Sequence, residues 1–342
     1  MSPRRFRWLI GLLVAAHAVV LFAGFFSPYD PTTQNRELSF APPTRPHFLD
    51  PAGHLHLRPF VYQLKDSTTA IGAYDEDTSR PYPLALFARG AAYRIAGVVP
   101  SQWHLFGVAE PARVFLLGTD RFGRDQFSRL LCGGQVSILA GLLATFFSLG
   151  VGMLVGCVAG FFGRLSDRVL MTCAELFLAL PWLYLLLGVR AMLPLHLEPT
   201  QAFLLVASVI GLIGWAKPGR MVRGIVLSAK ERNYVLAARG FGASRPYLLR
   251  RHILPETYGV LLTQATLLLP QYILAEVTLS FLGVGIAEPA PSWGNMLGAL
   301  QEYNVLVSYW WMFAPVLALF PLFLGYFGLA STLQKRTQTF TT

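Results

Sequence analysis

Long apolar stretches alternate along the chain with shorter polar and basic connections. A helix that crosses the hydrocarbon core of a bilayer needs about 20 mostly apolar residues, and six stretches meet or approach this length. They are residues 8–26, 136–162, 169–189, 201–215, 258–282 and 305–329. The pattern therefore predicts an all-α polytopic membrane protein with six transmembrane helices.

The first of these stretches has two interpretations. Ala16-His17-Ala18 resembles the small-residue site at which a signal peptide is cleaved. The apolar run, however, is longer than the roughly 7–15 residues of a signal-peptide core. We therefore expect an uncleaved membrane anchor.

Basic residues decide the orientation of the spans. When the N-terminus is placed in the cytoplasm, 16 Lys and Arg residues fall on the inner side and only Arg190 falls in the two short outer loops. Short connections rich in Lys and Arg stay in the cytoplasm. The count predicts cytoplasmic N- and C-termini, and it places one strongly basic connection, here called the basic segment (residues 217–256), in the cytoplasm.

The predicted spans divide the chain into three parts. A basic tip and the first span occupy residues 1–26, an extracytoplasmic insert with the lead-in to the second span occupies 27–135, and a membrane core occupies 136–342. The insert is rich in Pro, Asp and Arg and has short aromatic pieces, so we expect a small, partly β structure. Three histidines, His47, His54 and His56, suggest a metal site, and His54 and His56 could present two imidazoles on one face of a strand. The pattern contains no further ligand, so we interpret them as surface histidines and expect no metal.

Composition agrees with a membrane protein and argues against other classes. The chain is 54% hydrophobic and 13% charged, whereas a typical soluble domain is about 25% charged. Its net charge of +10 comes from basic residues placed between apolar runs, so lipid rather than nucleic acid is the expected partner. The sequence has no G-x-x-x-x-G-K-[ST], G-x-S-x-G or H-E-x-x-H motif. We therefore predict no nucleotide site, no cofactor and no enzymatic activity of its own.

Two carboxylates, Glu175 and Glu276, lie inside predicted spans. An acid in hydrocarbon is costly unless it is paired, protonated or facing water, which makes both residues candidates for a translocation path. Alternatively, each hydrogen-bonds backbone groups freed by a nearby proline, Pro181 or Pro270. The sequence leaves both interpretations open.

The basic segment has an unusual pattern of small residues among its arginines. Residues 223–238 are predicted to form one helix, followed by a sharp turn in which Gly240 and Gly242 allow positive φ. Ser244 is expected to cap a second helix, which ends at Pro255. A basic loop facing lipid headgroups would explain the arginines. It would not explain the small side chains, which would let another protein approach the backbone closely.

The stretch LAARGFGASRPYLLRRHILP resembles the cytoplasmic loop signature of bacterial ABC-importer permeases, E-A-A-x3-G-x9-I-x-L-P. Ala237, Ala238, Gly242 and Leu254-Pro255 match it, whereas Leu236 stands in place of the Glu and His252 stands where Ile is often found. Two further stretches, residues 116–138 and 273–297, are similar to the dipeptide and oligopeptide branch of this family, the C-type permease.

This resemblance implies the six-span type I importer fold and a permease subunit that imports peptides or a similar small solute, while partner subunits hydrolyse ATP. In this family the loop is a coupling helix that docks onto an ATPase subunit. The residues of this chain implied at that interface are Ala237, Ala238, Arg239, Gly240, Gly242, Arg245, Leu254 and Pro255. The implied partners are a second permease subunit, two cytoplasmic ATP-binding subunits, an extracytoplasmic solute-binding protein and lipid of the bacterial inner membrane.

The alternative is a self-sufficient, proton-coupled secondary carrier that uses Glu175 and Glu276. Inverted repeats are typical of such carriers, and the two halves of this chain show no clear similarity. Neither interpretation selects one substrate among dipeptides, oligopeptides, nickel chelates and sugars. Neither assigns a role to residues 27–113.

Overall fold

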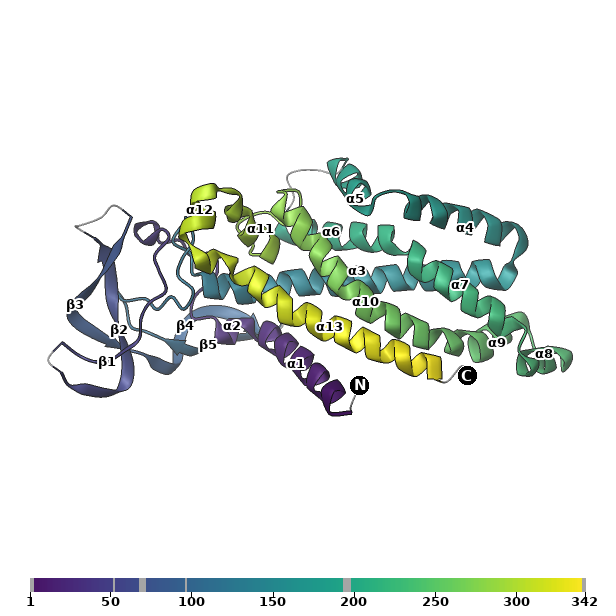
Figure 1. Cartoon of the computed structure of the whole chain (residues 1–342), viewed down its shortest axis with the longest axis horizontal. Helices are drawn as coiled ribbons and strands as arrows, with labels where there is room; N and C mark the ends of the chain where they lie inside the picture. The colour runs from purple at the N-terminus through teal and green to yellow at the C-terminus, as the bar shows by residue number, and fades with distance from the viewer. Residues whose placement is uncertain (1–2, 52, 68–71, 96, 193–197, 340–342) are drawn as a thin grey trace. The chain divides into compact units, whose positions relative to one another are not determined.

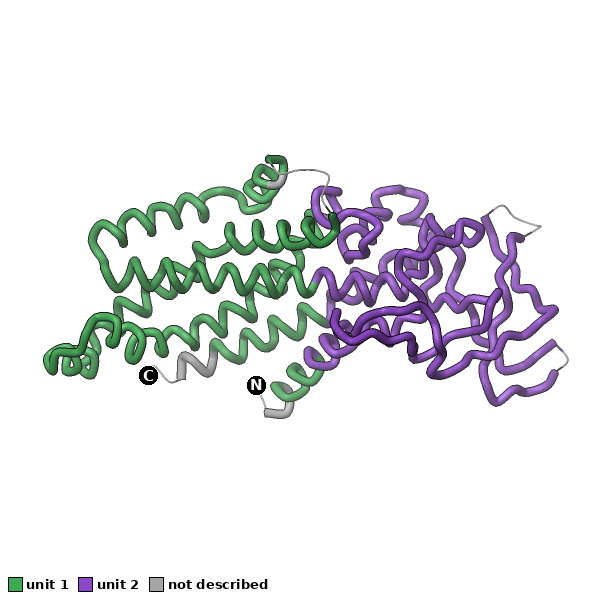
Figure 2. The backbone as a smooth tube through the Cα atoms, turned by 180° about the vertical axis from the view of Figure 1, so that it is seen from behind, with its two compact units in different colours: residues 1–12, 138–279, 322–342 green, residues 13–137, 280–321 purple. Residues whose placement is uncertain are grey.

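A computed structural model describes residues 3–51, 53–67, 72–95, 97–192 and 198–339. The chain folds into two compact units (Figure 2). We call residues 1–12, 138–279 and 322–342 the helical unit, and residues 13–137 and 280–321 the mixed unit. The side chains of the basic residues Arg4, Arg5, Arg190, Lys335 and Arg336, which entered the orientation count, lie outside the described part.

The helical unit contains the long apolar helices of the chain (Figure 1). Its elements, some of which extend into the mixed unit, are α1 (Pro3–Leu21), α3 (Gln126–Phe162), α4 (Arg164–Ala179), α5 (Trp182–Ala191), α6 (Pro199–Gly214), α7 (Ala216–Lys230), α8 (Asn233–Gly240), α9 (Arg245–Leu248), the π-helical turn η2 (Leu249–Ile253), α10 (Leu254–Phe281) and α13 (Ala314–Thr339).

Three uninterrupted helical stretches, residues 126–162, 245–281 and 310–334, are long and apolar enough to cross a membrane. Two bent helix pairs, α4 with α5 and α6 with α7, raise the number of candidate spans to five. Phe6–Leu21 of α1 is a shorter apolar helix. The protein is therefore mostly helical with several candidate membrane helices, and the sixth span remains a prediction.

Two predicted spans differ from the structure. The predicted span 169–189 is bent by 96° between α4 and α5, because Leu180, which precedes Pro181, takes an extended backbone and proline disfavours helical backbone in the residue before it. The predicted span 305–329 begins too early: residues 303–308 form the separate short helix α12 (Tyr303–Ser308). Tyr309 leaves the helical region, and a 3-10 turn, η4 (Trp310–Phe313), then leads into α13.

The mixed unit contains the strands. The strands β1 (His47–Leu49), β2 (Leu55–Asp66) and β3 (Tyr74–Pro83) form an antiparallel three-stranded sheet, and β4 (Ala85–Ile95) pairs with β5 (Val99–Gly107) as an antiparallel hairpin. In register, Gln63 lies opposite Asp77 and Arg89 opposite Trp103. Buried Val61, Tyr82 and Val114 form a small core with Ala112. The prediction of an all-α protein thus holds for the membrane core but not for the insert. The insert is partly β, as its aromatic pieces indicated.

The remaining elements of the mixed unit are short. They are α2 (Ala23–Phe26), η1 (Arg36–Leu38), α11 (Trp293–Gly298), η3 (Ala299–Gln301), α12 and η4. Ser292 begins α11 with a capping box, in which its hydroxyl accepts from the Asn295 backbone N–H and the Asn295 side chain accepts from the Ser292 backbone N–H. This capping box fixes the start of α11, within the stretch 273–297.

Candidate functional site

Residues 223–238 of the basic segment, predicted as one helix, are divided between α7 and α8. Helix α7 ends at Lys230, because Arg232 has an extended backbone. Helix α8 then begins at Asn233. The prediction of a single helix is therefore wrong at this point.

Helix α8 ends in a Schellman motif. The Ala243 N–H donates to the Ala238 carbonyl at 3.0 Å, and the Gly242 N–H donates to the Arg239 carbonyl at 3.0 Å. Gly242 has a φ of +85°, which side-chain-bearing residues rarely adopt. The predicted positive-φ turn is confirmed at Gly242, whereas Gly240 is the last residue of α8 and does not have a positive φ.

The second predicted helix begins where expected but does not end at Pro255. Ser244 takes the N-cap position of α9 with an extended backbone, but its side chain makes no capping hydrogen bond, so the predicted side-chain cap is wrong; Pro246 lies in the first turn. The helix continues through η2 into α10, so that residues 245–281 form one helical stretch. A proline inside an α-helix clashes with the preceding turn, and the wider π-helical turn directly before Pro255 accommodates its ring.

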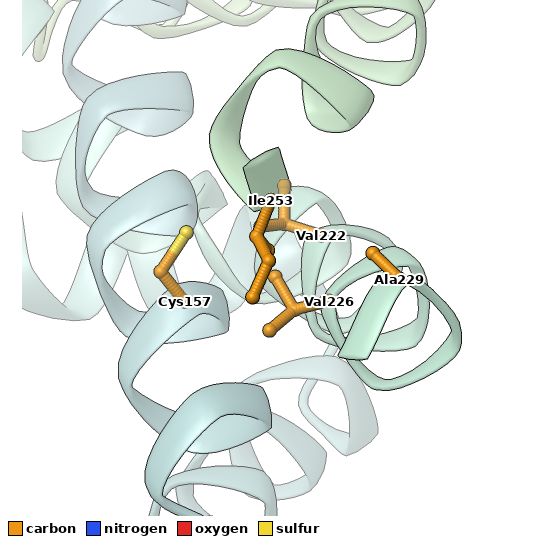
Figure 3. Close-up of a cluster of buried hydrophobic side chains, with 5 residues drawn as sticks. All are labelled: Cys157, Val222, Val226, Ala229 and Ile253. Atoms are coloured by element: carbon orange, nitrogen blue, oxygen red, sulfur yellow. The ribbon is translucent and has the colours of Figure 1, made fainter. Parts of the chain in front are cut away.

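A tightly packed pair of helices supports this segment. Gly156 and Gly160 of α3 lie so close to α7 that a Cβ on either would meet Val222 or Val226 atoms at under 3.0 Å. Small residues spaced four apart allow membrane helices to pack backbone to backbone. Ile253 of η2 joins the same buried cluster as Cys157, Val222, Val226 and Ala229 (Figure 3). The start of α10 is therefore held against α7 and α3.

Polar contacts fix the middle and the C-terminal end of α7. Lys230 donates from Nζ to the carbonyls of Gly160 at 3.0 Å and Phe161 at 3.1 Å, and so neutralises carbonyls at the C-terminal end of α3. Arg223 makes a two-point contact with Asp167 of α4, with Nε–Oδ1 at 2.9 Å and Nη2–Oδ2 at 2.6 Å. These contacts connect α7 to both neighbouring helices.

Glu256 connects α8 to the beginning of α10. The Tyr234 hydroxyl donates to Glu256 Oε1 at 2.8 Å, and Arg232 Nη2 lies 3.5 Å from Oε2. His252, at the position where the signature often has Ile, contacts the rings of Tyr234 and Tyr247 with centroid distances of 5.9 and 5.6 Å. Buried Val235 and Leu248 complete the inner face of the segment.

The outer face of the segment carries most of the predicted interface. Six of the eight residues are exposed and two, Ala238 and Leu254, are partly buried; the exposed ones are Ala237, Arg239, Gly240, Gly242, Arg245 and Pro255. Arg239 and Arg245 form no ion pair with any residue of the described part. The face thus combines small side chains with unneutralised positive charge.

One residue of this face was missed by the sequence analysis. Phe241, between the two glycines, is 93% exposed, and Leu236, in place of the signature Glu, is half exposed. The sequence did contain a signal for this exposed residue, namely an aromatic side chain between two glycines at a predicted turn. An exposed ring of this size is typical of interface anchors.

The two acids predicted inside spans have different environments. Glu175 is exposed on α4, whereas Glu276 of α10 is 0% exposed. The helical unit also contains a cavity of about 440 Å³, lined mostly by apolar residues of α4, α5, α6 and α10 together with Lys217 and Gln271. Neither acid is among its lining residues in the described part, so the structure does not bring Glu175 and Glu276 to one site.

The histidines of the insert share a carboxylate. His54 Nδ1 and His56 Nε2 each lie 3.2 Å from Asp50 Oδ2. The backbone N–H of His54, followed by the two imidazoles, holds the pKa of Asp50 at about 2. Within the described residues, no group of three or more His, Cys, Asp or Glu side chains is placed to hold a metal ion.

A second charged cluster lies in the mixed unit and was not predicted. Buried Arg124 and Arg129 contact Glu288, with Arg129 Nη2–Oε1 at 2.9 Å and Arg124 Nη2–Oε1 at 3.1 Å, and Arg124 Nε also donates to Asp120 at 2.7 Å. Arg129 is only 1% exposed. We call these four residues the arginine network. It joins the two stretches, 116–138 and 273–297, that resembled the peptide-importer branch.

Residues 152–339 match the family described as binding-protein-dependent transport system inner membrane component. The chain belongs to this family. The match contains the basic segment and leaves residues 1–151 outside it. Membership gives no support to the alternative of a self-sufficient carrier.

Several relatives in this permease family are named for peptides. A chain of Brucella suis biovar 1 whose name assigns it to peptide permeases is 38% identical over 194 residues, which cover 57% of this chain and 62% of the relative. The dipeptide transport system permease protein DppC of Bacillus subtilis is 36% identical, covering 59% and 61%. The oligopeptide transport system permease protein OppC of the same species is 35% identical, covering 60% and 65%. The chain thus spans less than two thirds of the length of these relatives.

Proposed function

We propose that this protein is the membrane permease subunit of an ATP-driven importer of peptides or a similar small solute. The observation that carries the proposal is the outer face of the basic segment: small residues and unpaired arginines on a rigidly supported glycine turn. The peptide names of its relatives support the substrate class. The chain itself has no nucleotide-binding motif, so the energy comes from a partner.

The basic segment docks onto a cytoplasmic ATPase subunit. Ala237, Gly240 and Gly242 allow a partner surface to reach the backbone, while Arg239 and Arg245 pair with acidic or polar groups of the partner. Phe241 adds an apolar anchor. Because Leu254 packs against the buried cluster of α3 and α7, a displacement of the segment reaches those helices directly.

The complete importer contains a second permease, two ATPase subunits and an extracytoplasmic binding protein. The protein lies in the bacterial inner membrane and crosses it six times, with both termini in the cytoplasm. Its parts are the basic tip and first span at residues 1–26, the extracytoplasmic insert at residues 27–135 and the membrane core at residues 136–342. ATP binding favours one of two orientations of the spans, and this difference in affinity drives the transition. Glu175 and Glu276 are retained as candidates for polar positions along the translocation path.

The close approach of the partner can be tested with a matched pair of glycines. Gly240 in α8 and Gly224 in α7 are both helical and exposed, and a Cβ at either position would have no atom within 4 Å. Gly240→Leu should lower peptide transport by roughly tenfold or more, since a leucine at the docking surface holds the partner away. Gly224→Leu should leave transport within about twofold of wild type.

The measurement is peptide uptake and ATPase activity of the complete importer in proteoliposomes. Equal transport by Gly240→Leu and wild type would contradict the docking surface. Uptake by the chain alone, driven by a proton gradient without any ATPase, would contradict the proposed function as a whole.

A further inference from the structure

The end of the β4–β5 hairpin exposes apolar side chains that no described part of the chain covers. Val98 is 74% exposed and Val99, the first residue of β5, is also exposed. Nearer the base of the hairpin, Phe87 and Trp103 are exposed as well. The three-stranded sheet also exposes apolar side chains, Leu55 and Leu57 among them, so the position and the charge of the hairpin are what distinguish it.

The hairpin packs against the helix that follows α1. His104 Nδ1 donates to the Ser27 carbonyl, and the Tyr93 ring lies so close to Gly24 that an added Cβ would overlap it. Tyr93 lies nearer the hairpin tip than His104, and Gly24 lies nearer α1 than Ser27. The contacts closer to the tip are therefore also the contacts closer to α1. The tip of the hairpin therefore lies towards the end of α2 that adjoins α1, and Figure 1 shows the hairpin beside α2.

The charge of the hairpin is of one sign. Residues 85–107 contain Arg89 and Arg94 and no Asp or Glu, whereas the three-stranded sheet at residues 47–83 contains five acids. Arg89 stacks on Trp103 with its Cζ 4.9 Å from the ring centroid. Trp beside Arg is a combination suited to the boundary between lipid phosphates and acyl chains.

We propose that the β4–β5 hairpin binds phospholipid and rests in the headgroup region of the outer leaflet, beside α1. Val98 and Val99 enter the upper acyl chains, and Arg89 and Arg94 contact phosphate oxygens. The open edges of a two-stranded ribbon have backbone groups that need water or phosphate as partners, which limits the hairpin to headgroup depth. The proposal rests on the orientation in the proposed function, with α1 as a membrane anchor.

The test uses a fluorescent reporter of lipid contact. Single cysteines are introduced at Val98, at Leu57 of β2 and at Val19 of α1, after Cys132, Cys157 and Cys173 are replaced by Ala. Each is labelled with a nitrobenzoxadiazole dye in the full chain in phosphatidylcholine nanodiscs. Leu57, 97% exposed in the other sheet, is the matched control in the insert, and Val19 reports on the anchor.

The fluorescence of the label at Val98→Cys should fall by about half when phosphatidylcholine carrying a nitroxide at acyl carbon 5 is added. A label at headgroup depth lies close to this nitroxide. A nitroxide at carbon 16 should quench it less. The label at Leu57→Cys should be unaffected by either lipid. A water-like, unquenched label at Val98→Cys together with a quenched label at Val19→Cys would overturn the inference and leave the topology standing.

An unquenched label at Val19→Cys would instead show that the proposed topology fails, and the inference with it. A label at Val98→Cys that lipid does not quench, but that an added extracytoplasmic protein shields, would assign the hairpin to a protein partner. If the cysteine-free chain does not fold, quenching of native tryptophan by brominated lipid replaces the dye. Trp103→Phe should then remove part of that quenching, and an unchanged quenched fraction would count against the proposal.

Discussion

The arginine network and the outer face of the basic segment use the same residue type in opposite ways. Arg124 and Arg129 are buried, and each meets a carboxylate within the mixed unit. Arg239 and Arg245 are exposed and form no ion pair within the described residues. A buried guanidinium requires a partner inside the chain, whereas an exposed one remains available for a partner outside it. Burial therefore separates the arginines that maintain the fold from those that can recognise another molecule.

The largest expected effect is the loss of a buried network member. Arg129→Met removes a fully buried guanidinium and leaves buried Asp120 and the partly exposed Glu288 with Arg124 alone, and we expect a loss of about 3–5 kcal/mol in the free energy of unfolding. Thermal or denaturant unfolding of the purified chain in detergent measures it. A decrease of less than about 1 kcal/mol in the free energy of unfolding would be the size expected for an exposed arginine. It would contradict the proposed difference between buried and exposed arginines.

A buried acid next to the network predicts a pH dependence. Burial raises the pKa of Asp125 to about 6, against hydrogen bonds from Ser128 that lower it. Between pH 3.8 and pH 6, Asp125 keeps its proton in the folded state but has lost it in the unfolded state. Protonated Asp125 therefore stabilises the folded state at pH 3.8, and this stabilisation is lost as the pH rises through 6.

Replacing this acid should remove that dependence. Relative to Asp125→Asn, the wild type should lose up to about 3 kcal/mol between pH 4 and pH 7. Unfolding midpoints of both proteins across this range provide the measurement. Parallel pH profiles would mean that Asp125 does not titrate in this way.

Reversing the exposed charges should change coupling without changing stability. The double substitution Arg239→Glu and Arg245→Glu should lower transport-coupled ATPase activity by about tenfold, since it places like charges against the proposed partner. Unfolding should shift by no more than about 0.5 kcal/mol. Arg168→Glu, an exposed residue of α4, is the control, and an equal loss of activity there would indicate a general charge effect.

The smallest effect is expected from a surface pair in the mixed unit. Arg121 Nη1 lies 3.4 Å from Glu302 Oε1, and both side chains are more than half exposed. Arg121→Gln should cost between 0 and about 1 kcal/mol in unfolding free energy. A cost as large as that of Arg129→Met would show that burial does not separate the two classes of arginine.

The sequence predicted the elements whose signals are local. Apolar runs located the long helices, and the glycine turn at Gly242 followed from residue type alone. The prediction failed where packing decides the outcome: helical structure continues through Pro255 because the π-helical turn accommodates the ring. It also failed at residues 303–313, where apolar residues form short helices and a turn instead of one span.

The candidate site was predicted in its residues but not in its support. Gly156 and Gly160 of α3 pack closely against α7, and nothing in one sequence identifies α7 as their neighbour. The arginine network joins residues more than 150 positions apart, a pairing that no local pattern specifies. Phe241 was overlooked because a single aromatic residue in an apolar chain is not distinctive until its exposure is known.

The helical stretch at residues 245–281 gives the basic segment a long reach. Its 37 residues correspond to about 55 Å of helix at 1.5 Å per residue. Because helical structure is continuous from α9 into α10, a tilt of about 5° of the stretch as one body would displace its far end by roughly 5 Å. A change in angle at the protein surface would thus become a displacement large enough to open or close a path for a small solute.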